Sequence, residues 1–243
     1  MTTASPERDD GFIRTDRPRI VMAGLRTFLD QWWVVGAWGA LAAASVLLLL
    51  RDLRRCNPEV AGLMKFVWIF TAAYSGPLGL WVYWSSGRKQ IPRDSLWRRA
   101  ARSVAHCYSG CGLGEVTGVI ITVGLLSLGN WWVAGVTFAL AYVAGFVLTV
   151  GPLMQDGVGF GEALLDAFYS ETASITVMEM VAVTIDLLLA RSATMSDAIF
   201  WSSLVVSLTM GLAAAYPVNA LLIRLGVKEG MHSPREMATH ANA

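Results

Sequence analysis

The sequence predicts an all-α protein, a polytopic transmembrane helix bundle of about six spans. Hydrophobic residues make up 55% of the 243 residues, and two runs, 33–50 and 131–150, contain no charged side chain. A helix of about 20 apolar residues crosses the ~30 Å hydrocarbon core of a bilayer. Seven tryptophans also lie near the ends of apolar runs, where indole rings favour the membrane interface: Trp32, Trp33, Trp84, Trp97, Trp131, Trp132 and Trp201.

Six spans follow in order from the apolar runs and the turn residues between them. They cover residues 32–50, 63–84, 104–128, 131–154, 171–190 and 197–222. The first run follows a polar leader of mixed charge, whereas secretory signals begin with a short basic stretch, so this run is predicted to be a retained helix. The leader is expected to be mobile.

The distribution of basic residues predicts an orientation. With six spans, both termini lie on one side together with about 14 of the 19 Lys and Arg residues. Such an excess marks the cytoplasmic side, so both termini are predicted to be cytoplasmic. The net charge of +1 gives no indication of a nucleic-acid partner. The predicted partner is the lipid bilayer. The sequence is also compatible with a homo-oligomer or with a complex with another membrane protein.

Four acidic residues fall inside the predicted spans: Glu115, Glu171, Glu179 and Asp186. A charged side chain at the bilayer centre costs at least about 2.5 kcal/mol. None of the four has a basic residue within its own span, so neutralisation must come from another helix, a bound cation or a proton.

The fifth span gathers most of this polarity on one face. At helical spacing Glu171, Met178, Glu179 and Asp186 form a stripe of about 100°, with Ser174 beside it. This stripe is predicted to face the bundle interior or a water-filled transport path. The alternative, an exposed position in the first helical turn that is stabilised by the helix dipole, applies more readily to Glu171 than to Glu179.

The third span opens with HCYSGCGLGE, which contains candidate metal ligands. Cys107, Cys111 and Glu115 are spaced by four residues and share one helix face, which His106 joins if the first turn is irregular. Thiolates, imidazole and carboxylate suit zinc, whereas thiolates with histidine or methionine suit Cu(I). A transition-metal ion is therefore the candidate cofactor or cargo.

The same segment has a purely structural interpretation. Gly110, Gly114 and Gly118 have the spacing that lets two membrane helices approach closely, and the two cysteines are then small buried thiols. With three cysteines in the chain, a disulfide framework is not predicted.

Topology places these groups together. The third and fifth predicted spans enter the membrane from the same side, so the His106–Cys111 segment and Glu171 are expected at similar depth. The sixth span ends on that side with the sequence AYPVN, which adds Asn219 to the predicted path.

Four segments resemble a bacterial membrane-protein family, domain of unknown function 4396: KFVWIFTAAYSGPLGLWVYW, HCYSGCGLGE, ETASITVMEM and AYPVNALLIRLGVKEGM. The resemblance covers residues 62–231. It implies a compact membrane domain of about five helices, with the first span as an appended helix. The predicted organisation is a polar cytoplasmic leader at 1–31, the first helix and loop at 32–61, the family-like domain at 62–231 and a flexible tail at 232–243, in the inner membrane of a bacterium. The resemblance brings no activity with it.

Three functions remain as hypotheses. The first is transport or binding of a transition-metal cation, with the carboxylates carrying charge or protons. The second is a membrane redox protein that uses Cys107 and Cys111, and the third is a non-catalytic subunit or scaffold. The chain has no HExxH motif and no phosphate-binding loop, so hydrolase and nucleotide chemistry are not predicted.

Overall fold

The computed structural model describes residues 12–155, 157–231 and 233–235, and this part of the chain contains helices and no strands. Five helices of this described part are long and apolar enough to cross a membrane, which confirms the predicted all-α membrane bundle. The helices are α1 (Phe12–Leu29), α2 (Trp32–Arg55), α3 (Gly62–Ser75), α4 (Pro77–Ser86), α5 (Leu96–Val119) with a π-helical continuation η1 (Ile120–Leu125), α6 (Asn130–Gln155), α7 (Phe160–Leu189) and α8 (Ala198–Arg224).

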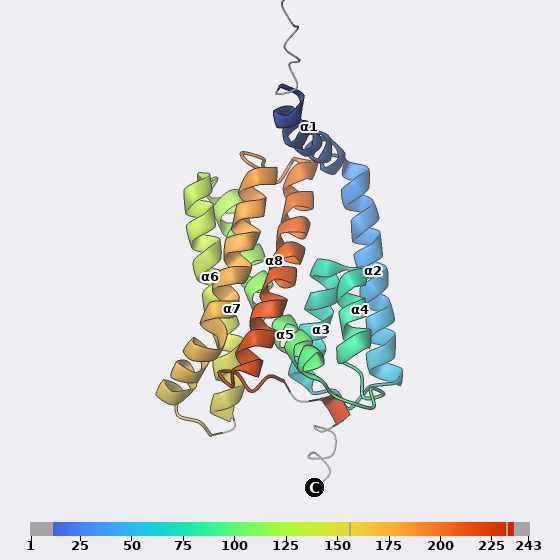
Figure 1. Cartoon of the computed structure of the whole chain (residues 1–243), viewed down its shortest axis with the longest axis vertical. Helices are drawn as coiled ribbons and strands as arrows, with labels where there is room; N and C mark the ends of the chain where they lie inside the picture. The colour runs from blue at the N-terminus through green and yellow to red at the C-terminus, as the bar shows by residue number, and fades with distance from the viewer. Residues whose placement is uncertain (1–11, 156, 232, 236–243) are drawn as a thin grey trace, which may run out of the picture.

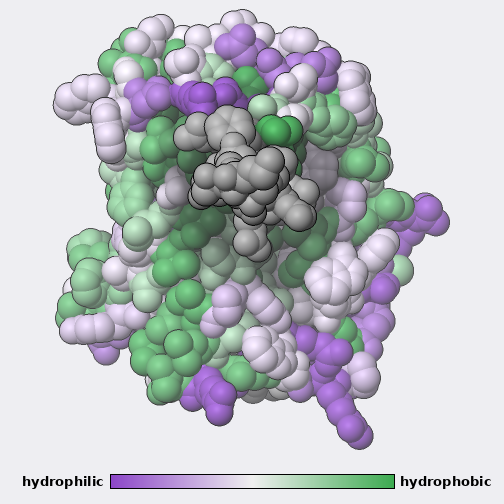
Figure 2. Space-filling model, turned by 45° about the horizontal axis from the view of Figure 1, so that its top comes forward, coloured by the Kyte–Doolittle hydropathy of each residue, from purple (hydrophilic) through white to green (hydrophobic). Residues whose placement is uncertain are grey.

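Helix α5 lies between two groups of helices. It packs against α6 and α8 on one side and against α3 and α4 on the other, and α7 packs against α6 and α8 (Figure 1). Hydrophobic residues cover the flanks of the bundle, and hydrophilic residues lie mainly towards the upper and lower margins of the view in Figure 2. This distribution fits a bundle that is surrounded by lipid.

The predicted span 63–84 is a helical hairpin and does not cross the bundle. The chain turns at Gly76, whose φ is +55°, and Pro77 begins α4. A Cβ on Gly79 would lie 2.4 Å from the carbonyl oxygen of Thr71, so α4 returns along α3 in close contact. Proline cannot continue the hydrogen bonding of α3, and glycine readily adopts positive φ, so this pair forms the turn.

This hairpin changes the topology. Because α3 and α4 begin and end at the same end of the bundle, the five long helices place α1 at the upper end and the segment after α8 at the lower end (Figure 1). The prediction that both ends of the chain share one side assumed six crossings, whereas five helices of the described residues are long and apolar enough to cross a membrane. Residues 1–11 and 236–243, which include most of the predicted tail, lie outside the described residues.

Two predicted polar segments are also helical. Residues 12–29 form α1 within the predicted leader, and α1 contacts the upper end of the bundle: Arg26 Nε donates to the Leu189 carbonyl at 3.0 Å, and the Asp30 carboxylate accepts from the Ile199 amide at 3.1 Å. Helix α7 starts at Phe160, eleven residues before the predicted span 171–190. The added turns contain Ala163 and Ala167, which are buried and extend the packed face of α7.

Candidate functional site

Glycines on α5 bring it against α6. A Cβ on Gly114 would lie 2.3 Å from the carbonyl oxygen of Leu140, and one on Gly118 would lie 2.9 Å from the Cα of Thr137. The glycine spacing therefore marks a close contact between two helix backbones, as predicted from the sequence. With this face fixed on α6, α5 places Glu115 and the thiols in the interior of the bundle.

The two thiols are buried and close together. Cys107 and Cys111 are both free, and their sulfur atoms lie 3.9 Å apart in a core cluster that also contains Met178. His106 lies near α6, with its Nε2 3.2 Å from the Leu148 carbonyl oxygen, and its buried Nδ1 has no hydrogen-bond partner among the described residues. Within the described ranges, no three His, Cys, Asp or Glu side chains are arranged to hold a metal ion. Metal binding by His106, Cys107, Cys111 and Glu115 therefore stays a prediction.

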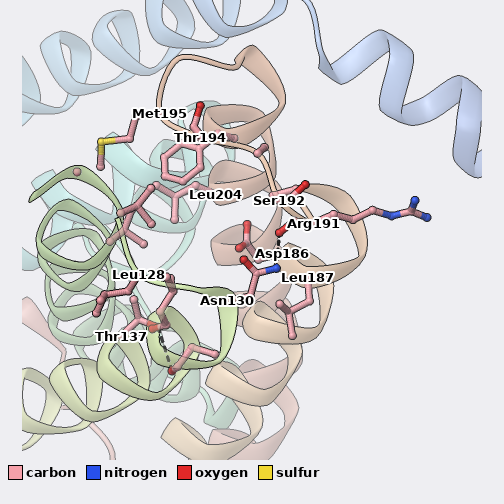
Figure 3. A pocket seen from close by; sticks show the side chains of 18 of the residues that line it. Leu128, Asn130, Thr137, Asp186, Leu187, Arg191, Ser192, Thr194, Met195 and Leu204 are labelled. Carbon is pink, nitrogen blue, oxygen red and sulfur yellow. Dashed lines mark hydrogen bonds between the residues drawn. The ribbon is translucent and has the colours of Figure 1, made fainter. Parts of the chain in front are cut away.

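A pocket of about 440 Å³ lies at the upper end of the bundle, between η1 and the starts of α6 and α8. Glu115 and Asp186 line this pocket, and Asp186 accepts a hydrogen bond from Ser203 at 2.7 Å. Arg191 is at its rim, but Figure 3 shows its side chain pointing away from the other lining residues. The pocket wall is therefore acidic.

Asp197 adds negative charge next to the mouth of this pocket, where Thr194 and Ser196 are lining residues. The Thr194 amide and hydroxyl donate to the Asp197 carboxylate at 2.7 and 2.9 Å. These hydrogen bonds, led by the one from the backbone amide, lower the pKa of Asp197 below its ordinary value. Asp197 is therefore ionised at neutral pH and favours the approach of cations.

Two carboxyl groups are buried without adequate partners. Glu179 is 1% exposed, and neither of its carboxyl oxygens has a hydrogen-bond partner among the described residues. Oε2 of Glu115 is also buried and has no hydrogen-bond partner among these residues. Glu115 and Asp186 line the same pocket, and Glu179 is on the helix that carries Asp186. A bare carboxylate is very costly in such surroundings, so these groups require a proton or a cation.

A second polar cluster lies towards the lower end. Lys228 Nζ donates to both carboxylate oxygens of Glu171 at 2.7 Å and to Asn219 Oδ1 at 3.1 Å. Asn219 Nδ2 in turn donates to Ser174 Oγ at 2.5 Å. Glu171 is 3% exposed, so the alternative of an exposed first-turn residue is wrong. The negative charge of Glu171 is neutralised by Lys228, which lies outside the helix that carries Glu171. A counter-charge from elsewhere in the chain was one of the possibilities that the sequence allowed.

Lys228 was not among the predicted site residues, because it lies beyond the last span. It belongs to a segment, residues 225–231, that folds back under the bundle, and we call this segment the strap. Gly226 and Gly230 have φ values of +73° and +74° on either side of Lys228. In the sequence the useful signal was a lone lysine between two glycines close behind a span, in a chain whose buried acids lack basic neighbours.

A protein-family model, described as a domain of unknown function (DUF4396), matches residues 96–228, more than half of the chain. The chain belongs to this family. Its DUF4396 domain comprises α5 to α8 and ends at Lys228, so the thiols, the buried carboxyls and the Glu171–Lys228 pair all lie within it. The segment KFVWIFTAAYSGPLGLWVYW precedes the matched residues. No curated protein and no solved structure matches the chain.

Proposed function

We propose that this DUF4396 protein moves a cation across the membrane, with Glu115, Glu179 and Asp186 as the groups that carry the cation or protons. The observation that supports this proposal best is Glu179, a fully buried carboxyl group in a membrane helix with neither oxygen hydrogen bonded in the described structure. Carboxyl groups inside membrane helices are rare and costly, and they mark ion pathways and proton relays.

The arrangement of the polar groups supports a path with one open end. The acidic pocket leads from the upper end to Glu115 and Asp186, and Glu179 lies on α7 seven residues before Asp186. The thiols follow on α5, and the Glu171–Lys228 ion pair closes the lower end. A pathway that is open at one end and closed at the other is what alternating access requires of a single state.

The thiols support a transition metal, in the copper or zinc class, as the cargo. Cys107, Cys111 and Met178 share one core cluster, and sulfur ligands favour soft ions such as Cu(I). Metal analysis of purified protein is expected to find copper or zinc in the wild type and at least about tenfold less in the variant with both Cys107→Ser and Cys111→Ser. Equal metal contents in the two proteins would remove the thiols from the cation path.

A redox role for the same thiols is the second candidate, because the sulfur atoms are 3.9 Å apart. A disulfide needs about 2.05 Å, so oxidation requires a local rearrangement of α5. Thiol alkylation of the purified protein distinguishes the two candidates: a redox protein loses two reactive thiols reversibly on mild oxidation, whereas a metal carrier is protected by the bound metal.

Transport is tested in proteoliposomes that contain a pH-sensitive dye, with Zn²⁺, Cu⁺, Na⁺ and K⁺ offered in turn. Wild-type protein is expected to couple one of these cations to a proton flux. Glu179→Gln preserves the shape of the side chain but removes the ionisable group, so the flux is expected to fall at least about tenfold. Glu162→Gln, an exposed position on the same helix, is the matched control.

Two results would contradict this function. One is the absence of flux through wild-type protein with all four cations. The other is a Glu179→Gln variant as active as the wild type, which is what a scaffold or a non-catalytic subunit predicts.

We also propose that the lower end is cytoplasmic and that the membrane is the bacterial inner membrane. With the hairpin topology, 13 of the 19 Lys and Arg residues lie at or beyond the lower ends of the helices, and basic residues concentrate on the cytoplasmic side. Cys56, the exposed cysteine, lies at the lower end of α2. A membrane-impermeant maleimide is expected to label Cys56 only in permeabilised cells, and labelling in intact cells would reverse this orientation.

A further inference from the structure

The cluster around Lys228 has the form of an occupied cation site. The ammonium group donates to three oxygen atoms, two of Glu171 and one of Asn219, and the Thr149 hydroxyl donates to Glu171 at 3.5 Å. The side chains of Lys228 and Glu171 are 9% and 4% exposed. A positive charge is therefore held in the interior by oxygen ligands from two helices, α7 and α8, and Thr149 of α6 contacts the Glu171 ligand.

The Asn219 ligand is oriented independently of Lys228. Asn219 Nδ2 donates to Ser174 Oγ at 2.5 Å and to the Ala215 carbonyl at 3.1 Å. These two bonds use the amide donors, so Oδ1 is left to face the ammonium group. The bundle itself thus orients one oxygen ligand of the site.

Lys228 enters this site from outside the bundle, on the strap. Arginines of α5 bind backbone carbonyl groups of the strap: Arg99 donates to the Glu229 carbonyl, and Arg102 donates to the Met231 carbonyl from Nε at 3.0 Å and from Nη2 at 2.8 Å. The strap is also joined to the end of α8, where the Val227 and Lys228 amides donate to the Leu222 carbonyl, and Met231 packs against a core cluster. These contacts hold the backbone of the strap, so the Lys228 side chain can leave the site by rotation about its own bonds, and glycines 226 and 230 permit changes of backbone angle beside it.

We propose that Glu171, Asn219 and Thr149 form a binding site for a hard monovalent cation, Na⁺ or K⁺, and that Lys228 occupies this site as a tethered competitor. A single carboxylate balances a single positive charge, whereas Ca²⁺ usually takes six to eight oxygen ligands with several carboxylates. Oxygen ligands favour hard ions over soft ones. The inference rests on the proposed function, to which it adds the ion exchanged at the lower end.

The Lys228 ammonium group and the proposed cation cannot occupy the site together, so cation binding and release of Lys228 are thermodynamically linked. A cation that binds only when Lys228 has left must increase the fraction of molecules with Lys228 free. The chain contains two other lysines, Lys65 and Lys89, whose ammonium groups bind near the surface to Pro58 and Glu59. They serve as internal references.

The test uses full-length wild-type protein in neutral detergent, with choline chloride replaced by NaCl or KCl at constant ionic strength. An amine-reactive ester labels the lysines, and mass spectrometry measures modification at each one. Lys228 labelling is expected to rise at least about fivefold in one of the two salts, while Lys65 and Lys89 labelling stays constant. Equal labelling of Lys228 in all three salts would overturn the proposal.

Variants supply a second, independent measurement. Lys228→Met removes the competitor, so its melting temperature is expected to rise by at least about 3 °C when Na⁺ or K⁺ replaces choline. Lys228→Arg keeps a cation in the site and is expected to respond as little as the wild type. The double variant Glu171→Gln with Lys228→Met lacks the carboxylate and is expected to show no rise. An equal rise in the single and double variants would also overturn the proposal; if Lys228→Met does not fold, the labelling result decides.

These measurements detect binding and do not require transport. A protein that fails them but shows Glu179-dependent flux retains the proposed function and loses only the site at Glu171. A protein that passes them without any flux binds a cation but does not carry it.

Discussion

Replacing Gly114 by alanine is expected to separate α5 from α6 and to destabilise the whole bundle. The added Cβ would lie 2.3 Å from the Leu140 carbonyl oxygen and 2.5 Å from its carbon. Both are backbone atoms of a helix, so no side-chain rotation relieves the overlap. The expected loss is about 3 kcal/mol or more, at the upper end of the range for overpacked cores, which corresponds to a melting temperature about 6 °C or more lower.

Gly135 provides the matched control for this substitution. It lies on α6, and a Cβ there would meet no atom within 4 Å. Gly135→Ala is therefore expected to leave the melting temperature unchanged or to raise it slightly, because alanine favours the helix. Thermal unfolding in detergent, followed by size-exclusion chromatography, makes the comparison. If Gly114→Ala melts within about 1 °C of the wild type, the backbone contact between α5 and α6 is wrong.

Breaking the Glu171–Lys228 pair is expected to have the second large effect. Both partners are almost fully buried, so Lys228→Met leaves a carboxylate in the interior without a counter-charge, and Glu171→Gln leaves an ammonium group there. Removing one partner of a buried ion pair typically costs about 3–5 kcal/mol. In choline buffer each single variant is expected to be destabilised by an amount in this range.

The double variant separates the ion pair from general packing. Glu171→Gln with Lys228→Met removes both charges, so it is expected to be more stable than either single variant, with a coupling energy of at least about 1 kcal/mol. Unfolding of all four proteins under identical conditions gives this double-mutant cycle. Additive losses would mean that the two side chains do not interact in the folded protein.

The membrane bundle could be predicted from the sequence because hydropathy is a local property. The free energy of transfer to lipid depends on the residues of each segment alone, so the apolar runs 33–50 and 131–150 identify membrane helices without knowledge of the rest of the fold. The close packing of α5 could also be predicted from the sequence, since the spacing of its glycines favours a close contact with another helix. The hairpin at Gly76 and Pro77 was not, because the apolar run 63–84 is equally suitable for one long span or two short antiparallel helices.

Some features of the candidate site could likewise be predicted from the sequence, and others could not. Sequence alone was enough to predict that Glu115, Glu171, Glu179 and Asp186 lie in membrane helices, because their neighbours in the chain are apolar. Which acid receives a counter-charge depends on tertiary packing: the strap brings Lys228 to Glu171, while Glu179 has no such partner in the described structure. Helix positions follow from local free energies of transfer, but an ion pair between residues 57 positions apart depends on how the chain returns.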